Sequence, residues 1–136
     1  MTCLKNIVKV EYIEVKNLGP LYHITESAVK LYGVPTFIDA SIIGLSSVEI
    51  TDKLDNKSRI YTEKLIFKTD IRIKFPQKHL VYRVTTADGN MFLVGDVDRP
   101  YTVTTIDEVF PSSITESGLI VYTVTYSSAH NILYIP

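Results

Sequence analysis

Residues 61–75 alternate between apolar and polar side chains with a period of two. The odd positions include Tyr61, Leu65, Phe67, Ile71, Ile73 and Phe75, and the even positions are mostly Lys64, Lys68, Asp70, Arg72 and Lys74. Because successive side chains of a strand point to opposite faces, this pattern predicts one face against a core and a mainly cationic face in water. At about 3.3 Å per residue the segment would span roughly 50 Å, against a usual strand of about five or six residues. We expect a long hairpin arm, or two strands separated by a bulge at Asp70.

Turn and stop signals bound this long segment on both sides. The polar cluster of residues 51–57 precedes it, with Asp55 and Asn56 at its tip, and Asp and Asn tolerate the left-handed backbone of tight turns. Pro76 follows it, and proline cannot donate a hydrogen bond to a strand ladder. The sequence therefore predicts a hairpin that turns at Asp55-Asn56 and ends before Pro76.

Shorter apolar segments between turn signals predict the other strands. These are residues 7–15, 36–43, 48–50 running into the polar cluster, 80–86, 91–94, 101–109, 119–126 and 131–135. The clearest hairpin joins residues 80–86 to 91–94, because Asp88-Gly89 supplies the positive φ values that tight turns need. Residues 25–32 form the one helix candidate, with Thr25 as a cap and Gly33 as the end, and a strand there is the alternative.

Residue usage supports a mainly β fold. The 136 residues include 16 Ile, 14 Val and 14 Thr, and β-branched side chains suit a pleated, half-buried surface. Nothing resembles a linker, and 46% hydrophobic residues suffice for a core without disulfide or metal support. We predict a single all-β domain over residues 1–136, a β-sandwich or small barrel with one long hairpin and at most one short helix.

Charge, cysteine content and hydropathy argue against several classes of protein. The chain has 14 Lys+Arg and 15 Asp+Glu, a formal net charge of −1, and so lacks the positive excess that binding to phosphate backbones exploits. Cys3 is the single cysteine and cannot form an intramolecular disulfide. No uncharged apolar stretch reaches the roughly 20 residues that span a membrane. We expect no nucleic-acid partner, no membrane and a cytoplasmic location.

No motif predicts a reaction. His23, His79 and His130 lie far apart and match no zinc-ligand spacing, and Asp96-Val97-Asp98 lacks the other residues of an EF-hand loop. The chain also lacks a GxSxG nucleophile elbow, an SxxK pair and a glycine-rich phosphate loop. The sequence therefore predicts no catalytic, cofactor or metal residues, and we expect that the protein is not an enzyme.

Two residue sets are candidate interface residues. The cationic face of the long segment consists of Lys64, Lys68, Arg72 and Lys74. A nucleic-acid surface would need aromatic side chains on that same face, whereas Phe67 and Phe75 are expected on the opposite one. The lysines either protect a long edge strand against unwanted pairing or dock a partner. Tyrosines of the C-terminal half, among them Tyr101 and Tyr126, suit either an interface or the core.

Part of the chain resembles small structural proteins of phages and prophages of gut Bacteroidetes. The resemblance extends over residues 80–126, about a third of the sequence, and its matching runs are Val84–Gly89, Phe92–Gly95, Arg99–Tyr101 and Tyr122–Ser128. The resemblance implies a virion component, of the tail or the head-tail connection, found in the virion or the cytoplasm of the bacterial host cell. It carries over no catalytic residues.

Three functions follow as hypotheses. The preferred one is a structural or assembly protein that forms homo-oligomers, or joins other virion proteins, by strand addition with the long hairpin as its reaching element. The alternative is a small binding module for a carbohydrate, peptide or protein, with a pocket lined by Tyr101 or Tyr126. An enzyme, the third, would require a cleft that gathers His79 or His130 with a carboxylate.

Overall fold

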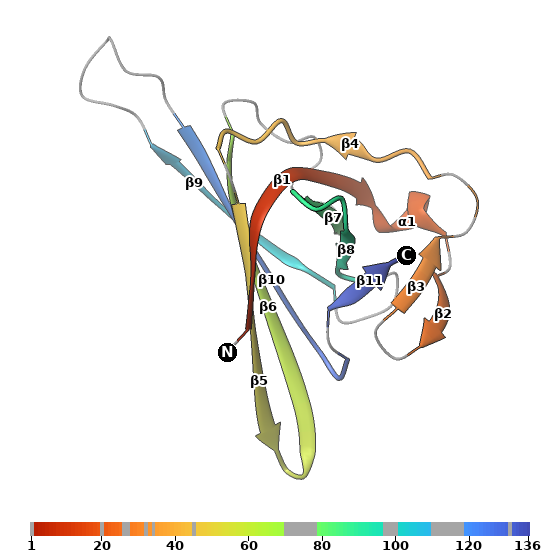
Figure 1. Ribbon diagram of the computed structural model, residues 1–136. Coiled ribbons are helices and arrows are strands. Elements are labelled where there is room, and N and C mark those ends of the chain that lie inside the picture. Colours follow the sequence, from red (N-terminus) through yellow and green to blue (C-terminus); the bar gives the residue numbers. More distant parts are fainter. Residues whose placement is uncertain are drawn as a thin grey trace, which may run out of the picture.

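The computed structural model describes residues 2–19, 21–25, 28–31, 33, 35–44, 46–69, 79–96, 101–109, 119–130 and 132–136. These ranges contain eleven strands and one four-residue helix, α1 (Val15–Leu18) (Figure 1). The strands are β1 (Thr2–Glu14), β2 (Leu21–Thr25), β3 (Ala28–Leu31), β4 (Ile38–Asp39), β5 (Ser46–Asp55), β6 (Ser58–Thr69), β7 (Leu80–Thr86), β8 (Met91–Val94), β9 (Val103–Val109), β10 (Leu119–Ser128) and β11 (Leu133–Ile135).

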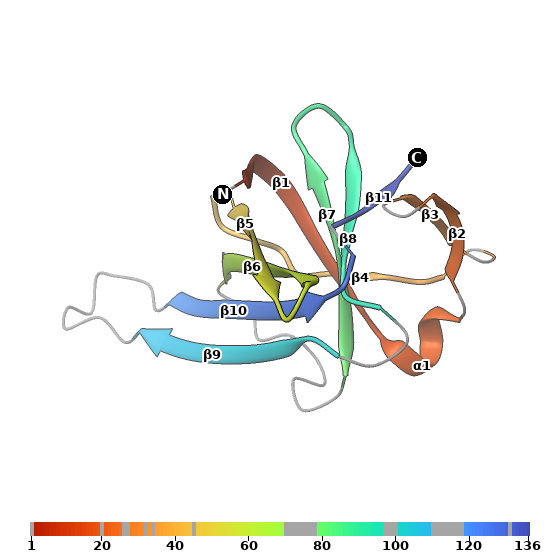
Figure 2. The same ribbon diagram turned by 90° about the horizontal axis from the view of Figure 1, so that it is seen from below.

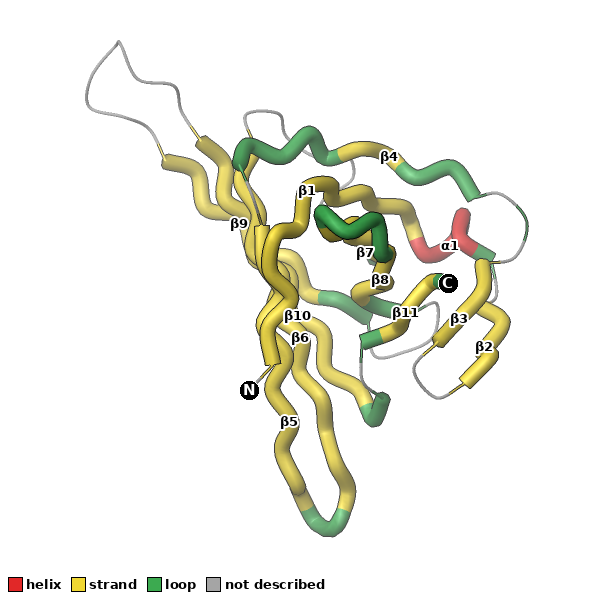
Figure 3. Tube along the Cα trace, in the orientation of Figure 1, coloured by secondary structure: helices red, strands yellow, loops and turns green. Residues whose placement is uncertain are grey.

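The strands form one curled sheet in the order β2-β3-β11-β8-β7-β1-β5-β6-β10-β9, and β4 pairs with β1 outside this path. Neighbouring strands are antiparallel except β3 and β11, which are parallel. The sheet curls into a half-barrel, so the all-β prediction with at most one short helix is confirmed (Figures 2 and 3). The start of β9 closes onto β7, where the Tyr82 hydroxyl lies 2.7 Å from Thr104 Oγ1 and Thr102 Oγ1 donates to the Leu80 carbonyl.

Strand β1 connects the two halves of the sheet. Its first residues pair with β5 and its later residues with β7, and the register shifts on both sides of Ile7. Asn6 adopts a φ of 59°, a left-handed value that asparagine tolerates better than most residues. Such an irregularity bends a strand and increases its twist, which lets one strand belong to two differently oriented parts of the sheet.

Two apolar clusters cover opposite faces of the sheet. Consecutive residues of β7 belong to different clusters, because neighbouring side chains of a strand point to opposite faces. Tyr82 packs in the larger cluster and Val81 in the smaller one. The larger cluster includes stacked rings of Phe67 and Tyr122, whose centroids lie 5.2 Å apart. The smaller cluster lies near α1 and includes Leu18. In β6 the odd residues 63, 65, 67 and 69 are buried and Lys64 and Lys68 are exposed, so the period-two prediction is confirmed over this part of the strand.

A charged pair links β1 to β7. Glu11 lies directly opposite Arg83, and the Arg83 guanidinium donates three hydrogen bonds of 2.9 to 3.1 Å to the two Glu11 carboxylate oxygens. The guanidinium carbon also lies 4.1 Å from the centroid of the Phe37 ring. Glu11 is buried, and the bidentate hydrogen bonds from Arg83 offset the hydration that its carboxylate loses on burial.

Several predicted elements differ from the structure. The helix prediction for residues 25–32 is wrong, and its strand alternative is confirmed over residues 28–31: β3 pairs with β2, where Val29 lies opposite His23 and packs in the smaller cluster. The helix lies instead over residues 15–18, at the end of the strand predicted over residues 7–15. The strand predicted over residues 36–43 is reduced to the two residues of β4. The long strand begins at Ser58 and its described part ends at Thr69, so the bulge at Asp70 lies outside the described residues.

The turn between β5 and β6 holds two residues in left-handed backbone, Asn56 with φ of 46° and Lys57 with φ of 67°. Glycine adopts such values without the steric cost that a Cβ brings. We expect Lys57→Gly to raise the free energy of unfolding by about 1 kcal/mol. Urea denaturation would measure it. Lys53→Gly, a matched change at an exposed strand lysine, should instead lower that free energy, and equal effects of the two variants would contradict the prediction.

Candidate functional site

The sheet ends in two strands, β2 and β9, and no other strand of the described ranges lies along the outer side of either. An edge strand presents backbone N–H and C=O groups that can pair with another chain. On β2 the side chains of Tyr22 and Ile24 are 63% and 50% exposed, and on β9 that of Val103 is 64% exposed. Both edges thus combine backbone hydrogen-bonding groups with exposed apolar side chains.

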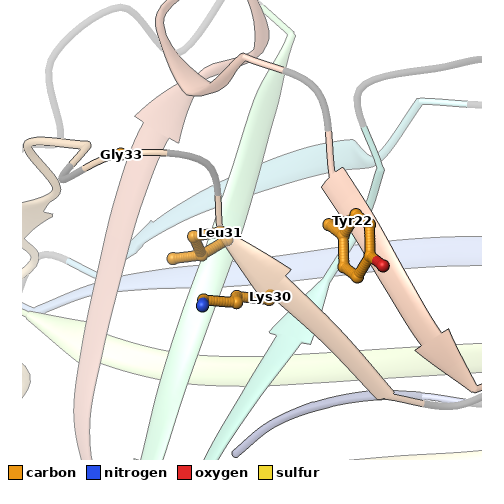
Figure 4. Close-up of a pocket in the computed structure, with 4 residues that line it drawn as sticks. All are labelled: Tyr22, Lys30, Leu31 and Gly33. Carbon is orange, nitrogen blue, oxygen red and sulfur yellow. The ribbon is translucent and has the colours of Figure 1, made fainter.

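A cleft of about 450 Å³ lies beside β2. Its described lining consists of Tyr22, Lys30, Leu31 and Gly33. Figure 4 shows Lys30 and Leu31 extending from β3 and Tyr22 from the neighbouring β2. Tyr22 and Lys30 are direct cross-strand neighbours, so an aromatic ring and an ammonium group lie together at this edge.

The hairpin of β5 and β6 extends beyond the rest of the sheet as an arm (Figure 1). We use "arm" for residues 51–60, among which every side chain that the structure describes is exposed. Its apolar side chains Leu54 and Ile60 are open to solvent, and Asp52 forms an ion pair with Arg59. The turn predicted at Asp55-Asn56 lies at Asn56-Lys57.

The predicted interface residues that the structure describes do not gather in one place. Lys64 and Lys68 are exposed on the outer face of β6, where Lys64 lies opposite Glu49 of β5 and Thr125 of β10. Arg72 and Lys74 lie outside the described residues. Tyr126 is only 2% exposed and belongs to the larger cluster, so its assignment to an interface is corrected: it is a core residue.

Tyr101 lies in a second, smaller cleft. Its ring stacks on that of His79 with centroids 4.1 Å apart. The two residues line a cleft of about 260 Å³ together with Glu14, Val15 and Lys16. Glu14 is mostly buried, and one of its carboxylate oxygens lies 3.3 Å from Lys16 Nζ. The cleft therefore brings together His79, Tyr101 and a carboxylate that is paired with Lys16.

A buried acid lies where the arm meets the core, and our sequence reasoning missed it. Glu63 is 0% exposed and faces inward between Ile50 of β5 and Tyr126 of β10. Neither of its carboxyl oxygens has a hydrogen-bond partner among the described residues. Burial raises the pKa of Glu63 from 4.5 to about 8, while the nearby His130 acts in the opposite direction. Glu63 is therefore mostly protonated at neutral pH.

His130, which influences the charge state of Glu63, lies close to two other polar groups. Its Nε2 lies 3.2 Å from the Tyr126 hydroxyl and 3.7 Å from an Asp96 carboxylate oxygen. The signal for Glu63 was present in the sequence, because it occupies an odd position of the 61–75 pattern between Tyr61 and Leu65. A carboxyl group in an otherwise apolar stripe is a departure that marks a strained or functional position.

The described residues contain neither a cluster of metal ligands nor a helix that could span a membrane. Within the described ranges, no three His, Cys, Asp or Glu side chains gather so that they could hold a metal ion. Val97 and Asp98 of the possible cation turn lie outside the described residues, as does the side chain of His23. None of the described helical residues forms a helix of the length and hydropathy that a membrane span requires.

Comparison of the chain with family models, with curated proteins and with solved structures gives no match.

Proposed function

We propose that this chain is a non-enzymatic assembly protein whose copies associate through strand edges, with the arm as an additional contact. The observation that supports this most directly is the open half-barrel, which leaves β2 and β9 as edges with exposed apolar side chains. Exposed edges of this kind pair readily with other strands, whereas monomeric proteins usually cover or charge them. Strand β2 contains neither a lysine nor a proline.

The resemblance to phage and prophage structural proteins extends the proposal to a virion component of the tail or the head-tail connection. Such assemblies consist of repeated copies that contact one another, which is the kind of association that two free edges and a projecting arm permit. In this role the protein would occur in the virion and in the bacterial cytoplasm before assembly.

The arm provides a direct test of this function. Native mass spectrometry and light scattering over roughly a hundredfold range of protein concentration should show oligomers that grow with concentration. Leu54→Asp, at the exposed tip of the arm, should weaken this association about tenfold, because it places a charge where a neighbouring copy would bury an apolar side chain. Val8→Asp, a similarly exposed apolar residue on a central strand, serves as the control and should associate like the unchanged chain.

A second candidate function is a small binding module, supported by the cleft in which Tyr101 stacks on His79. Aromatic rings beside a cleft are common in sites for sugars and other small ligands. A chain that stays monomeric at every concentration, and that binds a small ligand in a way that Tyr101→Ala abolishes, would contradict the assembly function and favour this one.

A further inference from the structure

Glu63 lies at the base of the arm, where the hairpin of β5 and β6 enters the core. Its side chain is fully buried, and neither of its carboxyl oxygens has a hydrogen-bond partner among the described residues. In such surroundings a carboxyl group is far more stable protonated than ionised, because burying an unpaired charge costs much more than burying an unpaired dipole. The closed form of this region therefore holds a proton on Glu63.

Two strands and one turn surround this carboxyl group. Ile50 of β5 and Tyr126 of β10 lie opposite Glu63 on its two sides. His130 belongs to the turn that follows β10, and a positive charge on it favours the ionised form of Glu63. Asp96, which has a carboxylate oxygen 3.7 Å from His130 Nε2, counteracts that charge. The surroundings therefore give an ionised Glu63 little compensation.

Solvent is close to Glu63 along the arm. The next pair toward the tip on the same face is Tyr61 with Asp52. Tyr61 is half-buried, and Asp52 is exposed and paired with Arg59. Two residues of a strand span roughly 7 Å, so a small movement at this end of the core brings water to Glu63 and leaves the other strands in place.

The end of β10 and the turn after it cover this end of the core. Strand β9 pairs with β10 only as far as Thr125, so residues 126–128 pair with β6 alone among the described strands. Ser128 Oγ donates a hydrogen bond to the His130 carbonyl, and the His130 side chain is 25% exposed. Strand ends that pair on one side open at a lower free energy than the central strands of a sheet.

We propose that the proton on Glu63 keeps residues 126–130 closed over the base of the arm, and that loss of this proton opens them while the rest of the sheet stays folded. The carboxyl O–H bond breaks, the proton passes to water and the carboxylate is hydrated in the opened form. This switch goes beyond the proposed assembly function, because it lies within one chain and does not require that copies associate. It makes the contact between the arm and the core depend on pH.

Proton linkage gives the direction of the effect. In the closed form burial holds the pKa of Glu63 at about 8, and in the opened form water returns it to about 4.5. Between these pH values the population of the opened form therefore rises nearly tenfold per pH unit, and above about pH 8 it rises no further. Opening should be about fiftyfold more frequent at pH 8 than at pH 6.

Hydrogen–deuterium exchange of the full chain, read by mass spectrometry of its peptides, tests this switch. After division by the intrinsic exchange rates, the protection of residues 124–130 should fall about fiftyfold from pH 6 to pH 8. Glu63→Gln and Glu63→Leu should each remove this dependence on pH, because neither side chain can ionise. Glu49→Gln, a matched change at an exposed acid of the same hairpin, should leave it unchanged.

Exchange in about 1 M urea separates local opening from unfolding of the whole chain. Global unfolding exposes much surface, so exchange in β7 should increase at least about fivefold in this urea concentration, whereas exchange in residues 124–130 should hardly change. If residues 124–130 show the urea dependence of β7, the turn opens only with the whole fold and the switch is refuted. If their protection varies with pH in Glu63→Gln as it does in the unchanged chain, another group controls the opening and the proposal is equally wrong.

Discussion

Glu63→Leu is expected to raise the free energy of unfolding by about 3 kcal/mol at pH 7, with a further increase at higher pH. In the folded chain the pKa of Glu63 is about 8, whereas in the unfolded chain it returns to about 4.5. Between these pH values the folded chain keeps a proton that the unfolded chain releases, so the stability of the unchanged protein falls as the pH rises. Leucine removes this penalty because it has nothing to ionise.

The pH profile distinguishes this mechanism from simple core packing. Urea denaturation between pH 4 and pH 9 should show a stability difference between Glu63→Leu and the unchanged chain that grows from about pH 4.5 and becomes constant above about pH 8. The full difference that depends on pH is about 5 kcal/mol. Glu63→Gln should show the same pH dependence with a smaller gain, because its amide stays buried without a partner.

Glu49 supplies the matched control. It lies on β5 of the same hairpin but is exposed, so Glu49→Leu should change the free energy of unfolding at pH 7 much less than Glu63→Leu does. If the difference in unfolding free energy between Glu63→Leu and the unchanged chain stays constant from pH 4 to pH 9, the Glu63 carboxyl group is hydrated in the folded protein and the prediction is wrong.

Arg83→Met is expected to lower the free energy of unfolding by about 3 to 5 kcal/mol. The change removes the three hydrogen bonds to Glu11 and leaves Lys9, whose Nζ lies 3.8 Å from a carboxylate oxygen, as the ion-pair partner of Glu11 among the described residues. It also removes the contact between the guanidinium and the ring of Phe37. Urea denaturation at neutral pH would measure the loss.

Two further variants assign the cause of that loss. The double variant Glu11→Leu with Arg83→Met should recover most of the lost stability, because it removes the unpaired charge together with its partner. Arg59→Met breaks the exposed pair with Asp52 in the arm and should cost at most about 1 kcal/mol. Similar losses for Arg83→Met and Arg59→Met would contradict a special role for the buried pair.

Local patterns in the sequence predicted the parts of the fold that depend on neighbouring residues. Asp88-Gly89 predicted the hairpin of β7 and β8, and the alternation in residues 61–69 predicted which side chains of β6 face the core. The same pattern placed Glu63 on the inward face of the strand, but it could not predict which groups surround the Glu63 carboxyl. The burial of its carboxyl group depends on Ile50 and Tyr126, which belong to other strands.

Pairing between strands that are far apart in the sequence determined which residues are buried and which segments form strands, where residue type alone did not. Tyr126 is buried and Tyr22 is exposed although both lie in strands, because β10 lies between two strands and β2 lies at an edge. Residues 28–31 form a strand because β3 pairs with β2 and with the distant β11.

The sequence by itself therefore determined the strand content, the main turns and the inward and outward faces of single strands, since these follow from side-chain alternation along the chain. Only the tertiary structure decided which strands became edges, which tyrosines entered the core and where a carboxyl group was left without a partner. These properties depend on which strands become neighbours, and residues far apart in the sequence determine that.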